Sequence, residues 1–381
     1  MNQIATRARL PLLALGIFAL LAGMWAGLLR LAWLIPPIVP TLAGVHGPLM
    51  VAGFLGTLIS MERAVAIGRR WTYAAPLFSA LGALVLIAGV APELGTLLIT
   101  LGSAAMVAIF IVIVRRQTVP FTIAMAVGAV CWLIGNAVWL FGAPISRVVL
   151  WWTAFLVLTI VGERLELSRL LRLSRQTESL FVAAIGIFLA GLVADFVEGL
   201  VASGDGLAIG TRIAGFGMIA LALWLLRNDI ARRTVRQTGL TRFIALALLT
   251  GYVWLLIGGA LRVAIGDVSG GPQYDAILHT VFLGFVFSMI FGHAPIILPA
   301  VLGRAMPYRR LFYAHLALLH LSLVLRVAGD LGGWFALRQW GGMFNVIAIL
   351  LFLISTARAL RTAAKQARRD AAQQRIEKTA N

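Results

Sequence analysis

The chain has 381 residues, of which 61% are hydrophobic and 12% are charged, and its mean hydropathy is +0.97. This composition excludes a water-soluble globular protein and indicates an integral membrane protein. A net charge of +18 would suggest a nucleic-acid partner in a soluble chain. Here the arginines cluster in short connections between apolar segments, so they report membrane topology and we expect no nucleic-acid site.

Runs of about 20 apolar residues, each long enough for a helix to cross a bilayer, recur along the chain. Continuous runs of this kind favour helices over the short alternating strands of a membrane barrel. We therefore predict an all-α fold, a polytopic bundle of about twelve transmembrane helices that forms one domain over 1–357. The predicted spans are 10–34, 45–67, 74–91, 94–114, 119–141, 148–167, 178–201, 207–226, 243–265, 275–300, 311–329 and 336–357.

The connections between these spans alternate in charge. Arg69 and Arg70, and then Arg115 and Arg116, fall on one side, whereas acidic residues such as Asp267 fall on the other. The positive-inside bias makes the basic side cytoplasmic, and an even number of spans then places both termini in the cytoplasm. The first apolar run is long and is interpreted as a retained helix rather than a signal peptide.

The stretch 358–381 is rich in Arg and Ala and is predicted to be a basic cytoplasmic tail. Such a tail suits contact with anionic lipid at least as well as contact with a protein, so membrane lipid is the first expected partner. The residue usage and the charge bias together favour a bacterial inner (plasma) membrane.

All five histidines lie within or at the ends of apolar spans, at His46, His279, His293, His315 and His320. An ionisable ring at membrane depth usually faces a bundle interior, a partner or a cofactor. His46 opens the second span and His279 lies near the start of the tenth, and the topology places both close to the outer surface. Two imidazoles from different helices at one level can hold a haem iron between them, so His46 and His279 are the predicted cofactor ligands.

The other three histidines are candidates for a second, inner metal or haem site. His293 lies 14 residues after His279, so on a regular helix the two imidazoles share a face at opposite depths, roughly 21 Å apart along the axis. His315 begins the eleventh span near the level of His293, and His320 lies closer to mid-membrane. The favoured inner pair is His293 with His315, and helix-packing hydrogen bonds are the alternative for each ring.

Two arginines at the outer ends of spans could meet the carboxylates of a haem. Arg262 ends the ninth span and Arg326 ends the eleventh, both near the level of the outer histidine pair. A guanidinium fork suits carboxylate oxygens. Ordinary pairing with Asp267 or Asp330, or snorkelling at the interface, is the alternative.

Two carboxylates at the cytoplasmic ends of spans are candidates to admit protons toward a buried site. Glu62 lies beside Arg63 on the second span, and Glu163 lies beside Arg164 on the sixth. Interhelical pairing of these glutamates with arginines is the favoured alternative.

Four local sequences stand out on these spans: HGPLMVAGF from His46, GYVWL from Gly251, HTVFLG from His279 and LRV from Leu325. With these sequences, its twelve spans, its outer histidine on the second and its histidine-bearing tenth, the chain resembles subunit I of the haem–copper oxidase superfamily, and more closely the divergent NnrS branch. The resemblance extends over nearly the whole chain. It implies an inner-membrane protein with b-type haem and copper that is linked to nitric oxide and nitrosative stress, with His46 and His279 at the outer haem level.

The departures from that superfamily argue against oxygen reduction. An oxidase would have a His-x-His pair in the tenth span and copper ligands in the sixth and seventh, and here the sixth and seventh contain no histidine. Haem binding with electron transfer, nitric oxide binding or protection against nitrosylated metal remain open. A proton-coupled secondary transporter is an alternative function, and so is a copper-handling protein that uses Met50, Met61 or Met289 with histidine.

Overall fold

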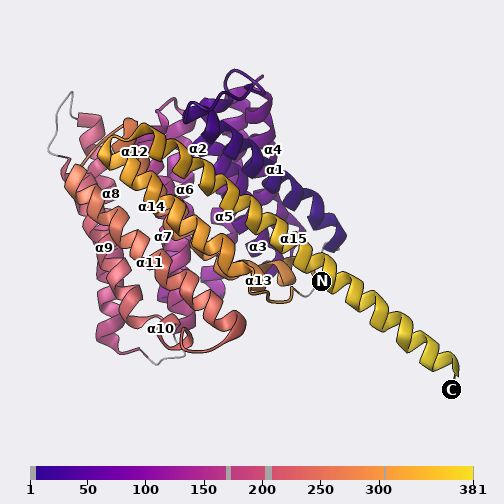
Figure 1. Cartoon of the computed structure of the whole chain (residues 1–381). Helices are drawn as coiled ribbons and strands as arrows, with labels where there is room; N and C mark the ends of the chain where they lie inside the picture. The colour runs from indigo at the N-terminus through magenta and orange to yellow at the C-terminus, as the bar shows by residue number, and fades with distance from the viewer. Residues whose placement is uncertain (1–5, 169–172, 202–207, 304–305, 381) are drawn as a thin grey trace.

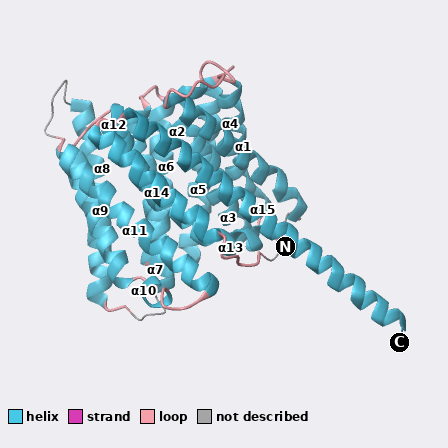
Figure 2. Ribbon diagram, in the orientation of Figure 1, coloured by secondary structure: helices cyan, strands magenta, loops and turns pink. Residues whose placement is uncertain are grey.

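The computed structural model describes residues 6–168, 173–201, 208–303 and 306–380, with side chains described between residues 9 and 363 of these ranges. The described chain consists of helices and their connections (Figures 1 and 2). It contains twelve helical stretches that are long and apolar enough to cross a membrane. The predicted all-α bundle of twelve spans is confirmed.

The first six spans contain both regular and irregular helices. The second span combines four short segments, and the third begins with a 3₁₀ turn. Their bounds are α1 (Thr6–Arg30); η1 (Leu42–Val45), α2 (His46–Pro48), η2 (Leu49–Gly56) and α3 (Thr57–Ile67) as the second span; η3 (Arg70–Tyr73) with α4 (Ala74–Ala88) as the third; and α5 (Pro92–Arg116), α6 (Pro120–Leu140) and α7 (Ile145–Ser168).

The last six spans also contain one irregular span, the tenth, which is built from three segments. A short helix also joins the eighth and ninth spans. Their bounds are α8 (Arg175–Val201), α9 (Ile209–Asn228), the connecting α10 (Ala231–Thr234), α11 (Gly239–Ile265); α12 (Gly271–His279), η5 (Thr280–Phe287) and α13 (Ser288–Leu302) as the tenth span; and α14 (Phe312–Gly332) and α15 (Phe335–Ala380).

The first span ends earlier than predicted, at Arg30 instead of position 34. The amide of Ala32 donates to the carbonyl of Leu29 at 3.0 Å, and the amide of Trp33 donates to that of Leu28 at 3.2 Å. These two bonds close a Schellman motif, which needs a left-handed residue after the helix. Ala32 occupies that position with φ 55°, so the chain turns before position 34 is reached.

The sixth and tenth spans are the most enclosed. The most apolar stretch of Ile145–Ser168 is 78% buried and that of Gly271–Leu302 is 67% buried, against 33% for α5 and for α8. The π-helical part of the tenth span contacts α7, α11 and α14. Most of this span therefore faces other helices.

The second and tenth spans each contain an eight-residue π-helical segment that begins within three residues of a histidine, η2 after His46 and η5 after His279. Both segments overlap the same motif, Phe-Leu-Gly-x-x-x-Ser-Met, at 54–61 and at 282–289. Such segments are rare and occur frequently at functional sites. The two spans are thus built alike after His46 and His279.

The glycines of this repeated motif admit large rings from neighbouring helices. A Cβ on Gly56 would collide with the indole of Trp132 in α6, and a Cβ on Gly284 would collide with the indole of Trp254 in α11. The i→i+5 bonding of η5 also turns each residue by less than the 100° of an α-helix. The predicted shared face of His279 and His293 assumed a regular α-helix between them, so it no longer holds.

The last span continues without a break into the predicted tail, because α15 is one helix over Phe335–Ala380. The predicted boundary at 357 falls inside it. Figure 1 shows the helix extending beyond the bundle, with the start of α1 and the end of α15 at the same end of the molecule and α2 and α12 at the opposite end.

Candidate functional site

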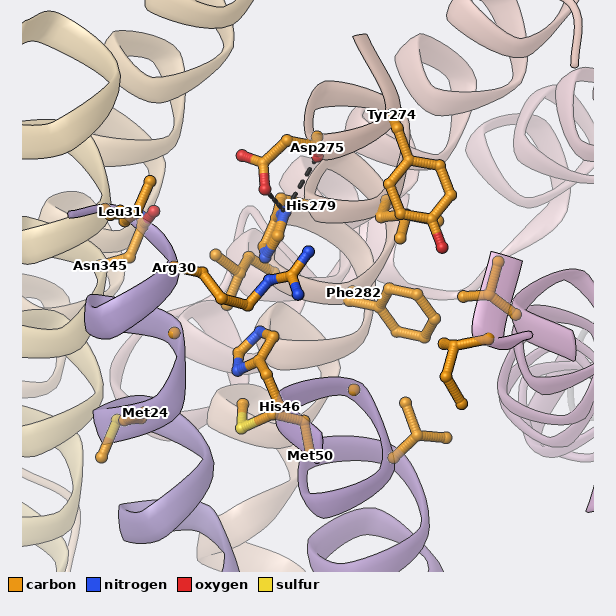
Figure 3. A pocket seen from close by; sticks show the side chains of 18 of the residues that line it. Met24, Arg30, Leu31, His46, Met50, Tyr274, Asp275, His279, Phe282 and Asn345 are labelled. Carbon is orange, nitrogen blue, oxygen red and sulfur yellow. Dashed lines mark hydrogen bonds and ion pairs between the residues drawn. The ribbon is translucent and has the colours of Figure 1, made fainter. Parts of the chain in front are cut away.

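A cavity of about 390 Å³ opens at the end of the bundle that holds α2 and α12 (Figure 3). It lies among α1, the second span, α7, the tenth span, α14 and α15. Its volume falls in the range of sites that bind small molecules and cofactors, roughly 300–1,000 Å³. Both His46 and His279 line it.

His46 is held against α1. Its Nδ1 lies 2.7 Å from the carbonyl oxygen of Gly23. A Cβ on Gly27 would come within 3.0 Å of the ring carbon Cε1, so the missing side chain at that position lets the imidazole approach the helix. Because Nδ1–H donates to a carbonyl, Nε2 carries the lone pair and is the nitrogen able to bind a metal.

His279 is held by the turn of helix that precedes it. Its Nδ1 lies 2.9 Å from the backbone carbonyl oxygen of Asp275 and 3.2 Å from the carboxylate Oδ1 of the same residue. Both acceptors fix the proton on Nδ1, so Nε2 is again the nitrogen with a free lone pair. This is the arrangement that orients metal-binding histidines in proteins.

The two imidazoles face each other across the cavity. Their ring centroids are 6.2 Å apart and their planes differ by 23°, and Figure 3 shows the side chains pointing toward one another. An iron bound at about 2 Å to one nitrogen of each ring separates the centroids by roughly 6 Å. The structure thus brings together the two rings singled out in the sequence, while their role as ligands stays a prediction.

A network of ion pairs adjoins His279 at the rim of the cavity. Arg326 donates from Nε to Oδ2 of Asp275 at 2.7 Å and from Nη2 to Oδ1 at 2.9 Å. Arg338 pairs with Asp330 at 2.9 Å and lies 3.9 Å from Asp275. Arg326 is therefore at the predicted level and lines the cavity, but its aspartate partner is Asp275 and not Asp330.

A third arginine, Arg30, also lines the cavity, and the sequence interpretation missed it. Its guanidinium lies beside the two imidazoles in Figure 3 and makes no ion pair with a carboxylate in the described part of the chain. The signal was available, because an arginine at the predicted outer end of the first span runs against the positive-inside bias. An arginine in such a position is a candidate for a binding role.

Arg262 does not line the cavity. Its side chain is buried and donates from Nη1 to the hydroxyl of Thr211 in α9 at 2.9 Å. Asp267, its predicted alternative partner, pairs instead with Arg147 at 3.7 Å. Arg262 thus joins α11 to α9.

Apart from its charged rim, the cavity has apolar walls. Aliphatic and phenylalanine side chains come from spans on every side, so they can enclose a flat, apolar group and exclude water from it. They include Leu28, Val51, Leu55, Val149, Phe282, Phe287, Val346 and Ile349.

His315 lies in a cage of phenylalanines and is 2% exposed. Its Nδ1 is 3.4 Å from the hydroxyl of Ser355, and Nε2 is buried without a hydrogen-bond partner. No contact with His293 or His320 is found among the described residues. The four rings around it belong to Phe243, Phe291, Phe312 and Phe352, with centroids 4.8 to 6.1 Å away.

His320 and His293 are engaged separately. The indole of Trp254 donates to Nδ1 of His320 at 3.0 Å, which leaves the proton of that ring on Nε2. His293 donates from Nδ1 to the carbonyl of Met289 at 2.7 Å. Among the described residues, no group of three or more His, Cys, Asp or Glu side chains is placed to hold a metal ion.

The two candidate proton-admitting glutamates lie beside one arginine. Glu163 accepts a hydrogen bond from Arg63, and Glu62 lies 3.9 Å from the same guanidinium. This pairing between the second and sixth spans is the interhelical pairing that was predicted as the alternative to proton entry. Both carboxylates are partly exposed, 30% for Glu62 and 24% for Glu163.

A buried polar cluster that the sequence interpretation missed lies behind this pair. Asp229 accepts a hydrogen bond from the hydroxyl of Tyr252 at 3.0 Å and from the amide of Ala231 at 2.7 Å. Arg164 lies 3.7 Å from the same carboxylate. The cluster joins α7 to α11 and to the connection after α9, and no spacing in the sequence relates its members.

These features define a class, a multi-pass all-α membrane protein with a cavity between two facing imidazoles at one end of its bundle. Over residues 9–361 the chain matches the family described as a domain of unknown function, DUF8744. The protein belongs to that family. A comparison with curated proteins gives no match.

Proposed function

We propose that the protein binds a b-type haem between His46 and His279 and is a membrane haem protein of the NnrS kind. The observation that carries this proposal is the pair of facing imidazoles, 6.2 Å apart, with both Nδ1 atoms engaged by oxygens. With their rings at this centroid separation, the two Nε2 atoms would hold one iron between them.

The residues around the pair support the same cofactor. The apolar walls suit a porphyrin and keep water from it. The exposed guanidinium of Arg30, together with Nη1 of Arg326, can donate to two carboxylates at the rim. Bound haem would supply an iron that takes up or gives up one electron and binds diatomic gases.

The proposed role is electron transfer or a response to nitric oxide and nitrosative stress at a bacterial inner membrane. Oxygen reduction is not part of it, because the sixth and seventh spans carry no histidine for a copper centre. We place both termini in the cytoplasm, which the charge bias supports. The haem site then lies toward the outer surface, because α2 and α12 are opposite the chain ends (Figure 1).

Copper is a second candidate occupant of the same cavity. Met50 lines it together with both histidines, and thioether with imidazole suits Cu(I). Met61 packs in a small cluster with Val301. Proton-coupled transport has less support, since Glu163 is already held by Arg63.

Optical spectroscopy with metal analysis on one preparation tests the proposal. Protein purified in detergent from haem-replete cells should show a Soret band, a pyridine haemochrome of the b type and about one iron per chain. His46→Ala and His279→Ala should each lose most of the bound haem, because each removes one axial ligand.

His293→Ala is the matched control, since it removes an imidazole from the same span outside the cavity, and it should keep the band. Folded protein without Soret absorbance would overturn the haem proposal. Bound copper without iron in that material would favour the second candidate.

A further inference from the structure

The two facing histidines have unequal hydrogen-bond partners. His46 has a neutral backbone carbonyl beside its Nδ1, at 2.7 Å. The Nδ1–H of His279 lies between a carbonyl, at 2.9 Å, and the carboxylate of Asp275, at 3.2 Å. A carboxylate draws the Nδ1 proton more strongly than a neutral carbonyl does, so it makes Nε2 the better electron donor.

The position of this carboxylate is fixed by its other partner. Arg326 binds both oxygens of Asp275 through a guanidinium fork, at 2.7 and 2.9 Å. Asp275 is 15% exposed and Arg326 is 9% exposed, so water screens their charges little. A second pair, Arg338 with Asp330, adjoins them at 2.9 Å. Each of these four side chains has a defined partner.

We infer that Asp275 is a positioning residue that sets the donor strength of His279, and that the Asp275–Arg326 pair thereby fixes the redox potential of the site. This inference rests on the proposed haem. A negative charge next to His279 stabilises the oxidised iron and lowers the midpoint potential, whereas the positive charge of Arg326 opposes it. The two members of the pair therefore act with opposite sign.

Potentiometric titration of the haem Soret band in single variants tests this inference. Asp275→Asn removes the negative charge and keeps the shape, so the midpoint potential should rise. Arg326→Gln removes the positive charge that binds both oxygens of Asp275 and leaves only Arg338, 3.9 Å away, beside it, so the potential should fall. Loss of an outer-shell partner typically changes metal affinity 10–100-fold, and a tenfold change between the two oxidation states corresponds to about 59 mV for one electron.

Asp267→Asn is the control, because it removes an equal charge from an exposed position that does not line the cavity. It should shift the potential much less than either test variant. Shifts of equal sign for Asp275→Asn and Arg326→Gln, or shifts no larger than the control, would overturn the inference.

Haem content separates this test from the test of the proposed function. If Asp275→Asn does not retain haem, Arg326→Gln alone still decides the sign, and a fall in its potential supports the inference while a rise or no change overturns it. A wild type without haem refutes the proposed function itself, before any potential is measured.

Discussion

The cavity and the packed interior of the bundle use histidine in different ways. At the end with α2 and α12, His46 and His279 give Nδ1–H to oxygens and turn their side chains into a cavity. Deeper in the bundle, His315 is packed among four phenylalanine rings, and His320 accepts a hydrogen bond from Trp254. Of these arrangements, the first leaves a lone pair facing open space. The hydrogen bond at Nδ1 together with the space at Nε2, more than the presence of histidine in a span, distinguishes the two candidate ligands from the packing residues.

The largest effect is expected at the glycine that admits His46. In Gly27→Leu the new side chain would occupy the place of the imidazole, since a Cβ alone lies 3.0 Å from Cε1 and 3.2 Å from Nδ1. We expect the variant to lose nearly all bound haem while still folding. Haem per chain, measured by pyridine haemochrome, checks this.

Gly44→Ala is the matched control for that substitution, because nothing lies within 4 Å of a Cβ built there although the residue also lines the cavity. It should keep its haem. Equal loss in both variants would mean that the contact between Gly27 and His46 has no special part in the site.

The second prediction concerns the packed histidine. His315→Ala leaves a void among the phenylalanines and should destabilise the protein by about 2–4 kcal/mol. His315→Phe fills the same space and removes the buried, unpartnered Nε2, so it should cost much less. Thermal unfolding in detergent measures both, and haem content should not change. Loss of haem in His315→Phe would instead make this residue a ligand.

The third prediction concerns the free arginine at the rim. Arg30→Gln removes a charged donor to a cofactor carboxylate, worth about 1.5 kcal/mol at the low end for charged hydrogen bonds because the side chain is exposed. Haem transfer to apomyoglobin should therefore show roughly tenfold weaker retention. Arg30→Lys keeps the positive charge, so it should retain haem better than Arg30→Gln does. An unchanged transfer rate in Arg30→Gln would remove this residue from the site.

The smallest effect is expected at the turn that ends the first span. Ala32 adopts φ 55°, where a residue with a side chain is strained, and glycine is the usual residue there. Ala32→Gly should stabilise the protein by about 1 kcal/mol, visible as a small rise in melting temperature. A fall would show that the alanine side chain has a packing role.

Much of this architecture could be predicted from the sequence. Length and hydropathy define the twelve spans, and the alternation of apolar runs with turns puts His46 and His279 at one level. The π-helical segments were not predicted, because length and hydropathy do not distinguish i→i+5 from i→i+4 bonding within an apolar span. His279 precedes η5, so its predicted level does not depend on the bonding within η5. His293 follows η5, so its predicted face does depend on that bonding.

The partners of the charged residues were also beyond the sequence. One contact is an exception: Asp275 lies four residues before His279, a spacing that places both on one side of a helix, so their contact could have been predicted. Its pairing with Arg326 depends on how α14 packs against α12, which no local pattern encodes. Arg262 illustrates the converse, since it lies near the expected end of its span but its side chain bonds to Thr211 in α9 and does not line the cavity.

The most direct test of the account is pulsed electron paramagnetic resonance of the ferric protein labelled with ¹⁵N-histidine. Two imidazoles on one iron predict a low-spin signal with hyperfine couplings from two histidine nitrogens. A high-spin signal, or coupling from one histidine alone, would contradict the claim that His46 and His279 hold the same cofactor.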